Sequence, residues 1–265
     1  MIIIGEKLNS SIKSVAAAIE KKDTAFLQKL AQDQVAAGAH YLDVNTGIFM
    51  EKEGELLTWL CELVQEVVEV PLCIDSPNPA ALAQALPVIK KKPIINSLSL
   101  EQERYSRTIP LVKQYGTEVV ALCMDDAGIP RGSAQRLDIA RKLVERLTSD
   151  GVAIEDIYLD IMLQPIATDE QSGLVALETI GMLRREFPTV HITCGLSNIS
   201  FELPSRRLLN QAFAVAQISH GMDALIIDPL DGRMMSLLCS MRALMGHDDF
   251  CSDYLTAHRS GRLVT

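Results

Sequence analysis

Five apolar segments of this chain each end on an aspartate or an asparagine, and this repetition narrows the possible folds more than any other feature. The terminal residues are Asn45, Asp75, Asn96, Asp160 and Asn198. Each segment has the pattern of a strand and is followed by a loop and a helix-patterned stretch. A (β/α)₈ barrel gathers the carboxyl ends of its parallel strands on one face, where its site lies. The chain therefore predicts a polar site on one face of a barrel.

Eight strand-then-helix units run through the 265 residues, and a single α/β barrel needs roughly 250 residues. The near-continuous apolar strands are typical of parallel strands that are covered on both faces. The strands are expected near residues 2–5, 40–45, 71–75, 93–96, 118–124, 157–161, 191–196 and 223–228. No Pro-, Ser- or Gly-rich linker divides the chain, so we predict an α/β fold, a TIM-type barrel, as one domain over residues 1–265. An open doubly wound sheet is disfavoured because GEKLNSS after the first strand lacks a GxGxxG loop.

Composition excludes several classes of partner. The net charge of −9 leaves no basic stripe for nucleic acid. No apolar run reaches the roughly 20 residues that span a bilayer, and the start MIIIGEKLN has the pattern of a strand rather than of a signal peptide. The six cysteines form no CxxC pair; Cys73, Cys123 and Cys194 are expected as core residues of a cytoplasmic protein.

Polar residues after strands often cap the next helix, so this explanation has to be weighed first. Asn78 and Pro79 form a good cap and first turn beyond Asp75, which leaves Asp75 free. Residues 99–102 have the pattern of a capping box beyond Asn96. We therefore expect Asp75 and Asn96 to be available for a ligand.

The later strands have similar signals. Residues 168–171 have the pattern of another capping box beyond Asp160, and Pro204 opens a helix well after Asn198. A polar group left unpaired at an apolar rim costs about 1–3 kcal/mol, so a ligand is the expected partner. Asp43 and Asn45 lie on one side of their strand, where ligand contact and orientation of nearby loops are both open.

Carboxylate and amide side chains suit a ligand that presents both donors and acceptors. A carboxylate accepts two donors side by side, and an Asn amide both donates and accepts. The edge of a pterin ring offers this combination. Asp228 precedes Pro229 and is interpreted as a turn residue, so it is left out of the site.

Seven motifs together resemble the folate-dependent corrinoid methyltransferases, in order and over essentially the whole chain. They are GEKLN, YLDVNTG, PLCIDS, IINS, MDDAGIP, IYLDIMLQP and GLSNIS. The resemblance implies a pterin-binding barrel, usually a homodimer, with no metal of its own. Such enzymes move a methyl group between tetrahydrofolate and a corrinoid (cobalamin). The chain has no DxHxxG motif, so the corrinoid is expected on a separate partner protein.

By motif position, the resemblance assigns the pterin to three residues and the chemistry to one. Asp75, Asn96 and Asp160 would hold the pterin, and Asn198 would lie near N-5 as the catalytic residue. Arg206 is expected to contact the folate tail or the corrinoid, although a solvated helix face is the alternative. Possible supporting residues are Glu6, Asp43 and Asn45. No strong general acid is evident, and the resemblance leaves the direction open between tetrahydrofolate and 5-methyltetrahydrofolate as substrate.

Asp125 and Asp126 depart from the less acidic loop expected in this family, and could change which corrinoid protein docks. Among rivals, a dihydropteroate synthase would place basic residues after the last two strands, which read CGLSN and IIDPL. A divalent-metal barrel would normally show a Lys or His base at a strand end, whereas His40 and His191 begin strands. A folate-binding barrel without chemistry remains open.

Overall fold

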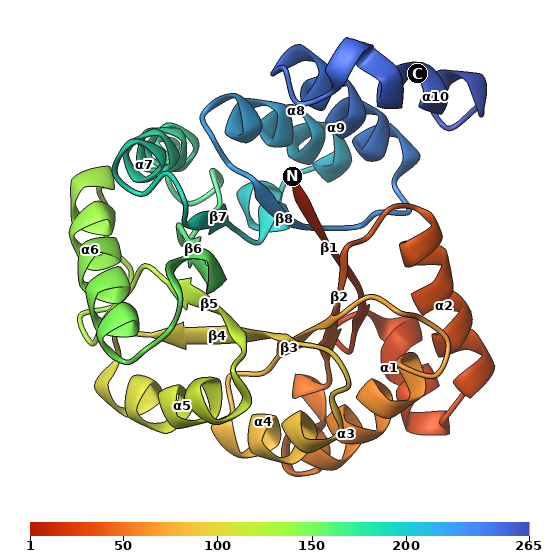
Figure 1. Ribbon diagram of the computed structural model, residues 1–265, viewed down its shortest axis with the longest axis vertical. Coiled ribbons are helices and arrows are strands. Elements are labelled where there is room, and N and C mark those ends of the chain that lie inside the picture. Colours follow the sequence, from red (N-terminus) through yellow and green to blue (C-terminus); the bar gives the residue numbers. More distant parts are fainter. Residues whose placement is uncertain (265) are drawn as a thin grey trace.

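The computed structural model describes residues 1–264, which form eight parallel strands surrounded by helices (Figure 1). The strands are β1 (Ile2–Asn9), β2 (Tyr41–Asn45), β3 (Leu72–Asp75), β4 (Ile94–Ser99), β5 (Glu118–Leu122), β6 (Ile157–Asp160), β7 (His191–Thr193) and β8 (Ala224–Ile227). They are hydrogen-bonded in the order β7-β6-β5-β4-β3-β2-β1-β8, with parallel register throughout. The predicted (β/α)₈ barrel is confirmed.

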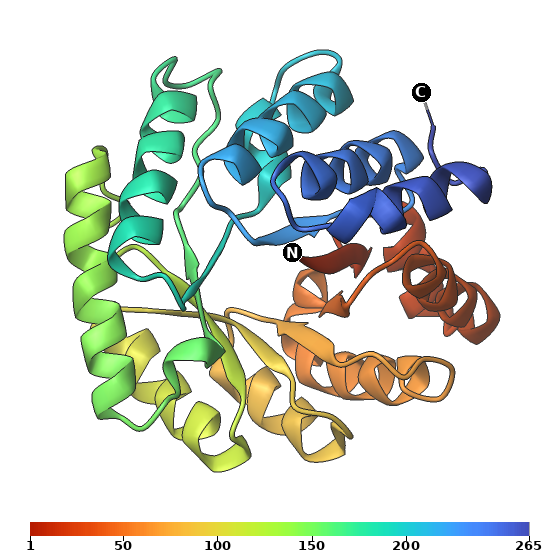
Figure 2. The same cartoon turned by 45° about the horizontal axis from the view of Figure 1, so that its top comes forward.

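Helices enclose the strands in both ribbon views (Figures 1 and 2). The α-helices are α1 (Lys13–Lys21), α2 (Thr24–Ala36), α3 (Glu53–Val64), α4 (Pro79–Ala85), α5 (Gln102–Tyr115), α6 (Ser133–Ser149), α7 (Ser172–Glu186), α8 (Arg206–Ser219), α9 (Gly232–Leu244) and α10 (Ser252–Arg259). Short 3₁₀ helices are η1 (Gly47–Lys52), η2 (Leu86–Val88), η3 (Ile154–Asp156), η4 (Leu196–Ser200) and η5 (Asp249–Cys251). No helix within residues 1–264 is both long enough and apolar enough to cross a membrane.

The core has two parts because each strand is buried on both faces. One large cluster fills the space between strands and helices, and a smaller one contains residues from six strands of the barrel. The members of the smaller cluster are Ile4, Cys73, Ile94, Val120, Tyr158 and Ala224. Inward layers of this kind fill the interior of a barrel. Because these side chains fill the interior of the barrel, a site has space only at the carboxyl ends of the strands.

The barrel is least continuous between β7 and β8. Among the described residues, a single bridge between Gly195 and Ile226 joins the two sides there, whereas every other neighbouring pair forms a ladder. The strand expected over residues 191–196 ends at Thr193, because the chain turns into η4 at Leu196. We call this gap in the ladder the seam.

The cap predictions had mixed outcomes. Asn78 caps α4, since its side chain accepts a hydrogen bond from the amide of Ala80 at 3.0 Å. The capping boxes over 99–102 and 168–171 are wrong: α5 begins at Gln102 and α7 at Ser172, and neither has a side-chain cap at its N-cap residue. Ser99 is the last residue of β4 and bonds Glu101 instead.

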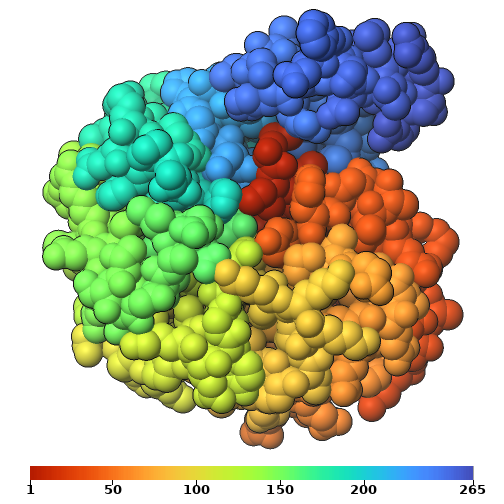
Figure 3. All heavy atoms as spheres, viewed as in Figure 1, coloured from red at the N-terminus to blue at the C-terminus, as the bar shows by residue number. Residues whose placement is uncertain are grey.

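Residues predicted as structural are so. Cys73, Cys123 and Cys194 are fully buried. His191 opens β7, and its Nδ1 lies 2.8 Å from Oδ2 of Asp223. The helices cover the outside of the barrel, and N-terminal residues are visible near the centre of the face in Figure 3.

Candidate functional site

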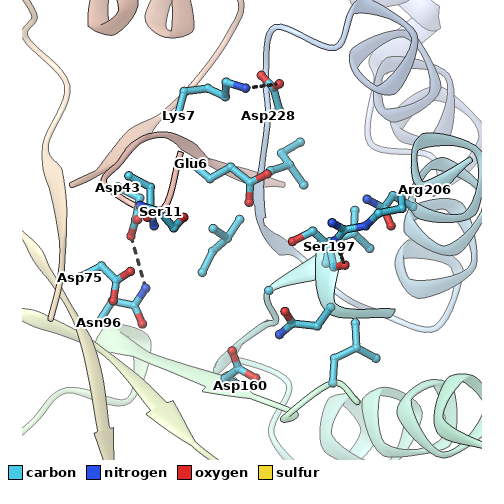
Figure 4. Close-up of a pocket in the computed structure, with 18 of the residues that line it drawn as sticks. Glu6, Lys7, Ser11, Asp43, Asp75, Asn96, Asp160, Ser197, Arg206 and Asp228 are labelled. Atoms are coloured by element: carbon cyan, nitrogen blue, oxygen red, sulfur yellow. Dashed lines mark hydrogen bonds and ion pairs between the residues drawn. The ribbon is translucent and has the colours of Figure 1, made fainter. Parts of the chain in front are cut away.

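A cavity of about 860 Å³ lies at the carboxyl ends of the strands (Figure 4). It is lined by seven of the eight residues predicted for the site: Glu6, Asp43, Asp75, Asn96, Asp160, Asn198 and Arg206. These residues come from β1, β2, β3, β4, β6, η4 and α8. Strand ends far apart in sequence therefore meet in one space, as a barrel requires.

Asn45 is the one residue predicted for the site that does not line the cavity. Its Nδ2 donates to Oδ2 of Asp75 at 2.9 Å, and its Oδ1 accepts from the Ser10 hydroxyl at 3.0 Å. Parallel register places Asn45 beside Asp75, and Asp75 beside Asn96. Asn45 therefore orients Asp75.

The carboxyl groups of Asp75 and Asp43 are held away from water. Burial raises the pKa of Asp75 to about 6, while the hydrogen bond from Asn45 opposes that rise. Asp43 is 2% exposed, and burial followed by the charge of Asp75 raises its pKa well above the usual range. Asn96 Nδ2 donates to Oδ1 of Asp43 at 3.3 Å. Neighbouring buried carboxyls of this kind are typical of functional sites.

Asp160 ends β6 and lies on another side of the cavity (Figure 4). Burial raises its pKa to about 6, although the backbone amide of Met162 donates to its Oδ1 at 2.7 Å. The charge of Arg136 also lowers the pKa of this carboxyl. Asp160 keeps Oδ2 available for a ligand because the amide of Met162 bonds only Oδ1.

Asn198 lines the cavity from η4, not from the end of a strand as expected. Its amide N–H donates to the carbonyl of Gly195 at 3.1 Å, which closes a tight turn after β7. The side chain is exposed, and Gly195 lies so close that a Cβ there would be 3.2 Å from Asn198 Nδ2. The turn brings this amide to the cavity that Asp160 also lines.

Lys7 and Asp228 also line the cavity, and neither was predicted for the site. Lys7 Nζ and Asp228 Oδ2 form an ion pair at 3.0 Å (Figure 4). Asp228 also makes the expected turn, because its Oδ1 accepts from the amide of Leu230 at 2.9 Å. In the sequence, the Pro after Asp228 was enough to explain this residue as part of a turn. Its ion-pair partner, Lys7, lies near the other end of the chain, so nothing in the sequence indicated the pair.

Glu6 extends into the cavity beside this ion pair (Figure 4). Burial and then the charge of Asp228 raise its pKa to about 7, against the opposing charges of Lys7 and Arg206. No strong general acid was evident from sequence, but this carboxyl exchanges a proton near neutral pH. In the sequence, the only sign that Glu6 belongs to the site was its place in the motif GEKLN.

Arg206 begins α8 and is held by the turn that carries Asn198. Its Nη2 donates to the Ser197 carbonyl at 2.7 Å, and its Nε to the Ser200 hydroxyl at 3.1 Å. The guanidinium also lies 5.9 Å from the ring centre of Phe201. Arg206 therefore stiffens η4 and supplies positive charge at the cavity, so it is more than a solvated helix face.

The acidic loop pair has structural tasks. Asp126 Oδ1 accepts from the amide of Gln102 at 3.2 Å, at the start of α5. Asp125 Oδ1 accepts from the amide of Ala127 at 2.9 Å. Across residues 1–264, no three His, Cys, Asp or Glu side chains are grouped as metal ligands.

The chain matches the family model described as pterin binding enzyme over residues 5–228. It is 40% identical over 265 residues to the methylcorrinoid:tetrahydrofolate methyltransferase of Eubacterium limosum, covering 99% of this chain and 98% of that protein. It is 30% identical over 241 residues to the methionine synthase of Mycobacterium tuberculosis. That alignment covers 86% of this chain but only 20% of the methionine synthase.

Among solved structures, the chain resembles a dihydropteroate synthase of Clostridium difficile crystallised in the presence of pteroic acid, with a TM-score of 0.72. The match covers 92% of this chain and 96% of that one at 17% identity. Identity this low shows a shared fold only. The family model and the full-length relative go further: the chain belongs to the pterin-binding enzymes, in the family of the folate-dependent corrinoid methyltransferases.

Proposed function

We propose that this enzyme transfers a methyl group from a methylated corrinoid protein to N-5 of tetrahydrofolate. The observation that carries the proposal is the grouping of Asp75, Asn96 and Asp160 with Asn198 around one cavity. The name of the Eubacterium limosum relative gives methylcorrinoid first and tetrahydrofolate second, which favours this direction. The methionine synthase match supports the same pair of substrates.

Asp75, Asn96 and Asp160 are the proposed pterin ligands. The edge of the ring presents N–H donors that two carboxylates can accept, while the Asn96 amide donates or accepts. Both carboxyls have raised pKa values, at about 6, because burial disfavours their charge. Ligand N–H groups stabilise the ionised form, so pterin binding offsets part of the cost of burying them.

Asn198 is the proposed catalytic residue. The lone pair of N-5 attacks the methyl carbon while the bond from methyl to the corrinoid breaks and leaves its electron pair there. N-5 then carries a positive charge until its proton departs. The Asn198 amide oxygen can accept a hydrogen bond from that N–H, which stabilises the charge as it develops.

The corrinoid is expected on a partner protein, where it supplies the methyl group and accepts the electron pair. The rim of the cavity carries Arg206 and Arg207, whose positive charges suit polar groups of an approaching partner. Assembly as a homodimer and a cytoplasmic location are also proposed, and light scattering on the purified protein tests the first.

Replacing Asn198 with Ala tests the assignment. We expect methyl transfer from methylcobalamin to tetrahydrofolate to slow by about 10²–10³-fold, the size found when one charge-stabilising hydrogen bond is lost from an active site. The dissociation constant of tetrahydrofolate should change little, because pterin contacts come from the strands. Absorbance follows the first quantity and calorimetry the second.

Gln114→Ala on the exposed part of α5 is the matched control and should leave both quantities unchanged. Equal losses of rate and binding in Asn198→Ala would contradict a catalytic role. Binding without turnover in the wild-type protein would instead indicate that only the corrinoid protein, and not free methylcobalamin, is a substrate.

A further inference from the structure

A second cavity of about 440 Å³ lies beside the first, between the loop after β5 and the loop after β6. The two cavities share Ile129 and Gln164 as lining residues, so they are neighbours at the same rim. The remaining lining residues are Pro130, Arg131, Arg136, Thr168, Asp169 and Ser172. None of the proposed pterin contacts accounts for this space.

Arg136 is the unusual member of the second cavity. It belongs to α6 and is 2% exposed, yet within residues 1–264 only its Nε forms a hydrogen bond, to the carbonyl of Pro130 at 3.2 Å. Its Nη1 is buried and has no hydrogen-bond partner among the described residues. A buried charged donor left unpaired is costly. The guanidinium therefore has unused donor capacity beside the cavity that the residue lines.

The surroundings of Arg136 favour an anion as its acceptor. Helix α7 begins at Ser172, which lines this cavity, so one helix N-terminus lies there. Arg131 adds a second positive charge, and it is exposed enough to reach solvent. Asp169, the one carboxylate among the lining residues, accepts from the amide of Gln171 at 2.9 Å, and the charges of Asp160 and Asp169 both act on Arg136.

We propose that the second cavity is an oxyanion subsite, which takes a carboxylate of a glutamyl tail on the folate or an inorganic phosphate. Two arginines and the N-terminus of α7 suit either group. The choice of a folate tail rests on the proposed function, and it follows from the shared wall at Ile129 and Gln164. A tail seated there would connect recognition of the pterin to recognition of its glutamates.

Calorimetry on the full chain tests the subsite with three pterins and one free anion. The ligands are 6-methyltetrahydropterin, which has no tail, tetrahydrofolate with one or three glutamates, and inorganic phosphate. The variants are Arg136→Gln and Arg131→Ala, the second on an exposed side chain that is not needed for folding. Arg141→Ala is the matched control, because Arg141 is on the same helix but pairs with Glu186 outside the cavity.

We expect Arg131→Ala and Arg136→Gln to weaken binding of the triglutamate by roughly 5–30-fold, as for loss of a charged hydrogen bond. Binding of 6-methyltetrahydropterin should stay within about twofold of wild type, and Arg141→Ala should leave every ligand unchanged. Phosphate should compete with the triglutamate and not with the tail-less pterin.

Two other outcomes have definite meanings. Phosphate binding that needs Arg136, with no effect of tail length, would support the subsite and identify a free anion as its ligand. Insensitivity of both phosphate and triglutamate to Arg131 and Arg136 would overturn it. Failure of wild-type protein to bind even the tail-less pterin would count against the proposed function, and the phosphate titration would then decide the subsite alone.

Discussion

Asp160 has a carboxyl group that the fold buries, although its charged form is more stable in water. It is 9% exposed, and burial raises its pKa to about 6 from the usual 3.8. The folded protein therefore holds a proton that the unfolded chain releases between these two values. Stability from this group is present below about pH 4 and is lost as the pH rises through 6. The carboxylate is retained at a cost, which is typical of a functional position.

Asp160→Asn should therefore stabilise the protein at pH 7 while weakening folate binding. The shift of about two pKa units corresponds to on the order of 2–3 kcal/mol in the free energy of unfolding. Urea titrations at pH 4 and pH 7 should show a gain only at pH 7. Asp138→Asn on the exposed face of α6 is the control, and a gain there or at both pH values would contradict this explanation.

Glu6 should set the pH dependence of the reaction, because its pKa is raised to about 7. A carboxyl with that pKa can accept the proton that N-5 loses after methylation. The rate of methyl transfer should rise with pH through about 7, and Glu6→Gln should flatten the profile while pterin binding is retained. Glu178→Gln, an exposed residue of α7, should keep the wild-type profile. An unchanged profile in Glu6→Gln would exclude this role.

At the scale of elements, η4 decides where the amide of Asn198, the proposed catalytic residue, lies. Arg206 holds the carbonyl of Ser197 and the hydroxyl of Ser200, and the turn begins where Gly195 approaches Asn198. The position of Asn198 therefore depends on contacts within a few residues and on one helix N-terminus.

Gly195→Ala should impair methyl transfer without unfolding the protein. The backbone φ of −71° accepts alanine, but the new Cβ would be 3.2 Å from Asn198 Nδ2 and would displace that amide. Displacements below 1 Å can cost up to about 100-fold in rate. Gly132→Ala, where a Cβ meets open space, is the control. A wild-type rate in Gly195→Ala, measured beside its melting temperature, would contradict the role given to this contact.

Elements were predictable from the sequence to a greater extent than the contacts between them. The apolar runs gave all eight strands, since burial on both faces leaves a clear signal. The start of α5 was misplaced because its first amide is met by Asp126, 24 residues further along the chain. The ion pair of Lys7 with Asp228 was missed for the same reason: both partners must be brought together by closure of the barrel.

Across the whole molecule, the hydrogen bonding between neighbouring strands of the barrel is sparse at one position. Seven neighbouring strand pairs form ladders, two of them with a register shift, and the seam between β7 and β8 has the single bridge of Gly195 and Ile226. Amides with few ladder bonds open more readily than those in a continuous sheet. The seam also lies at the cavity, because Gly195 and Ile226 both line it.

Hydrogen exchange should therefore be uneven around the barrel. Without ligand, amides of residues 191–199 should exchange faster than those of β5. Tetrahydrofolate should slow exchange at the seam, because it would contact both sides, and should leave α3 on the outside unchanged. Mass spectrometry of the exchanged peptides measures this, and equal protection of residues 191–199 and β5 before binding would contradict the prediction.

The seam also divides the cavity into parts that can change separately over evolutionary time. Asp75, Asn96 and Asp160 belong to strands of one continuous ladder, while Asn198 follows β7, at the edge of that ladder. Substitutions in the turn after β7 change Asn198, the proposed catalytic residue, or its neighbours, and disturb few hydrogen bonds of the sheet. Related proteins can thus differ in the residues of the turn after β7 and still keep the proposed pterin contacts on β3, β4 and β6.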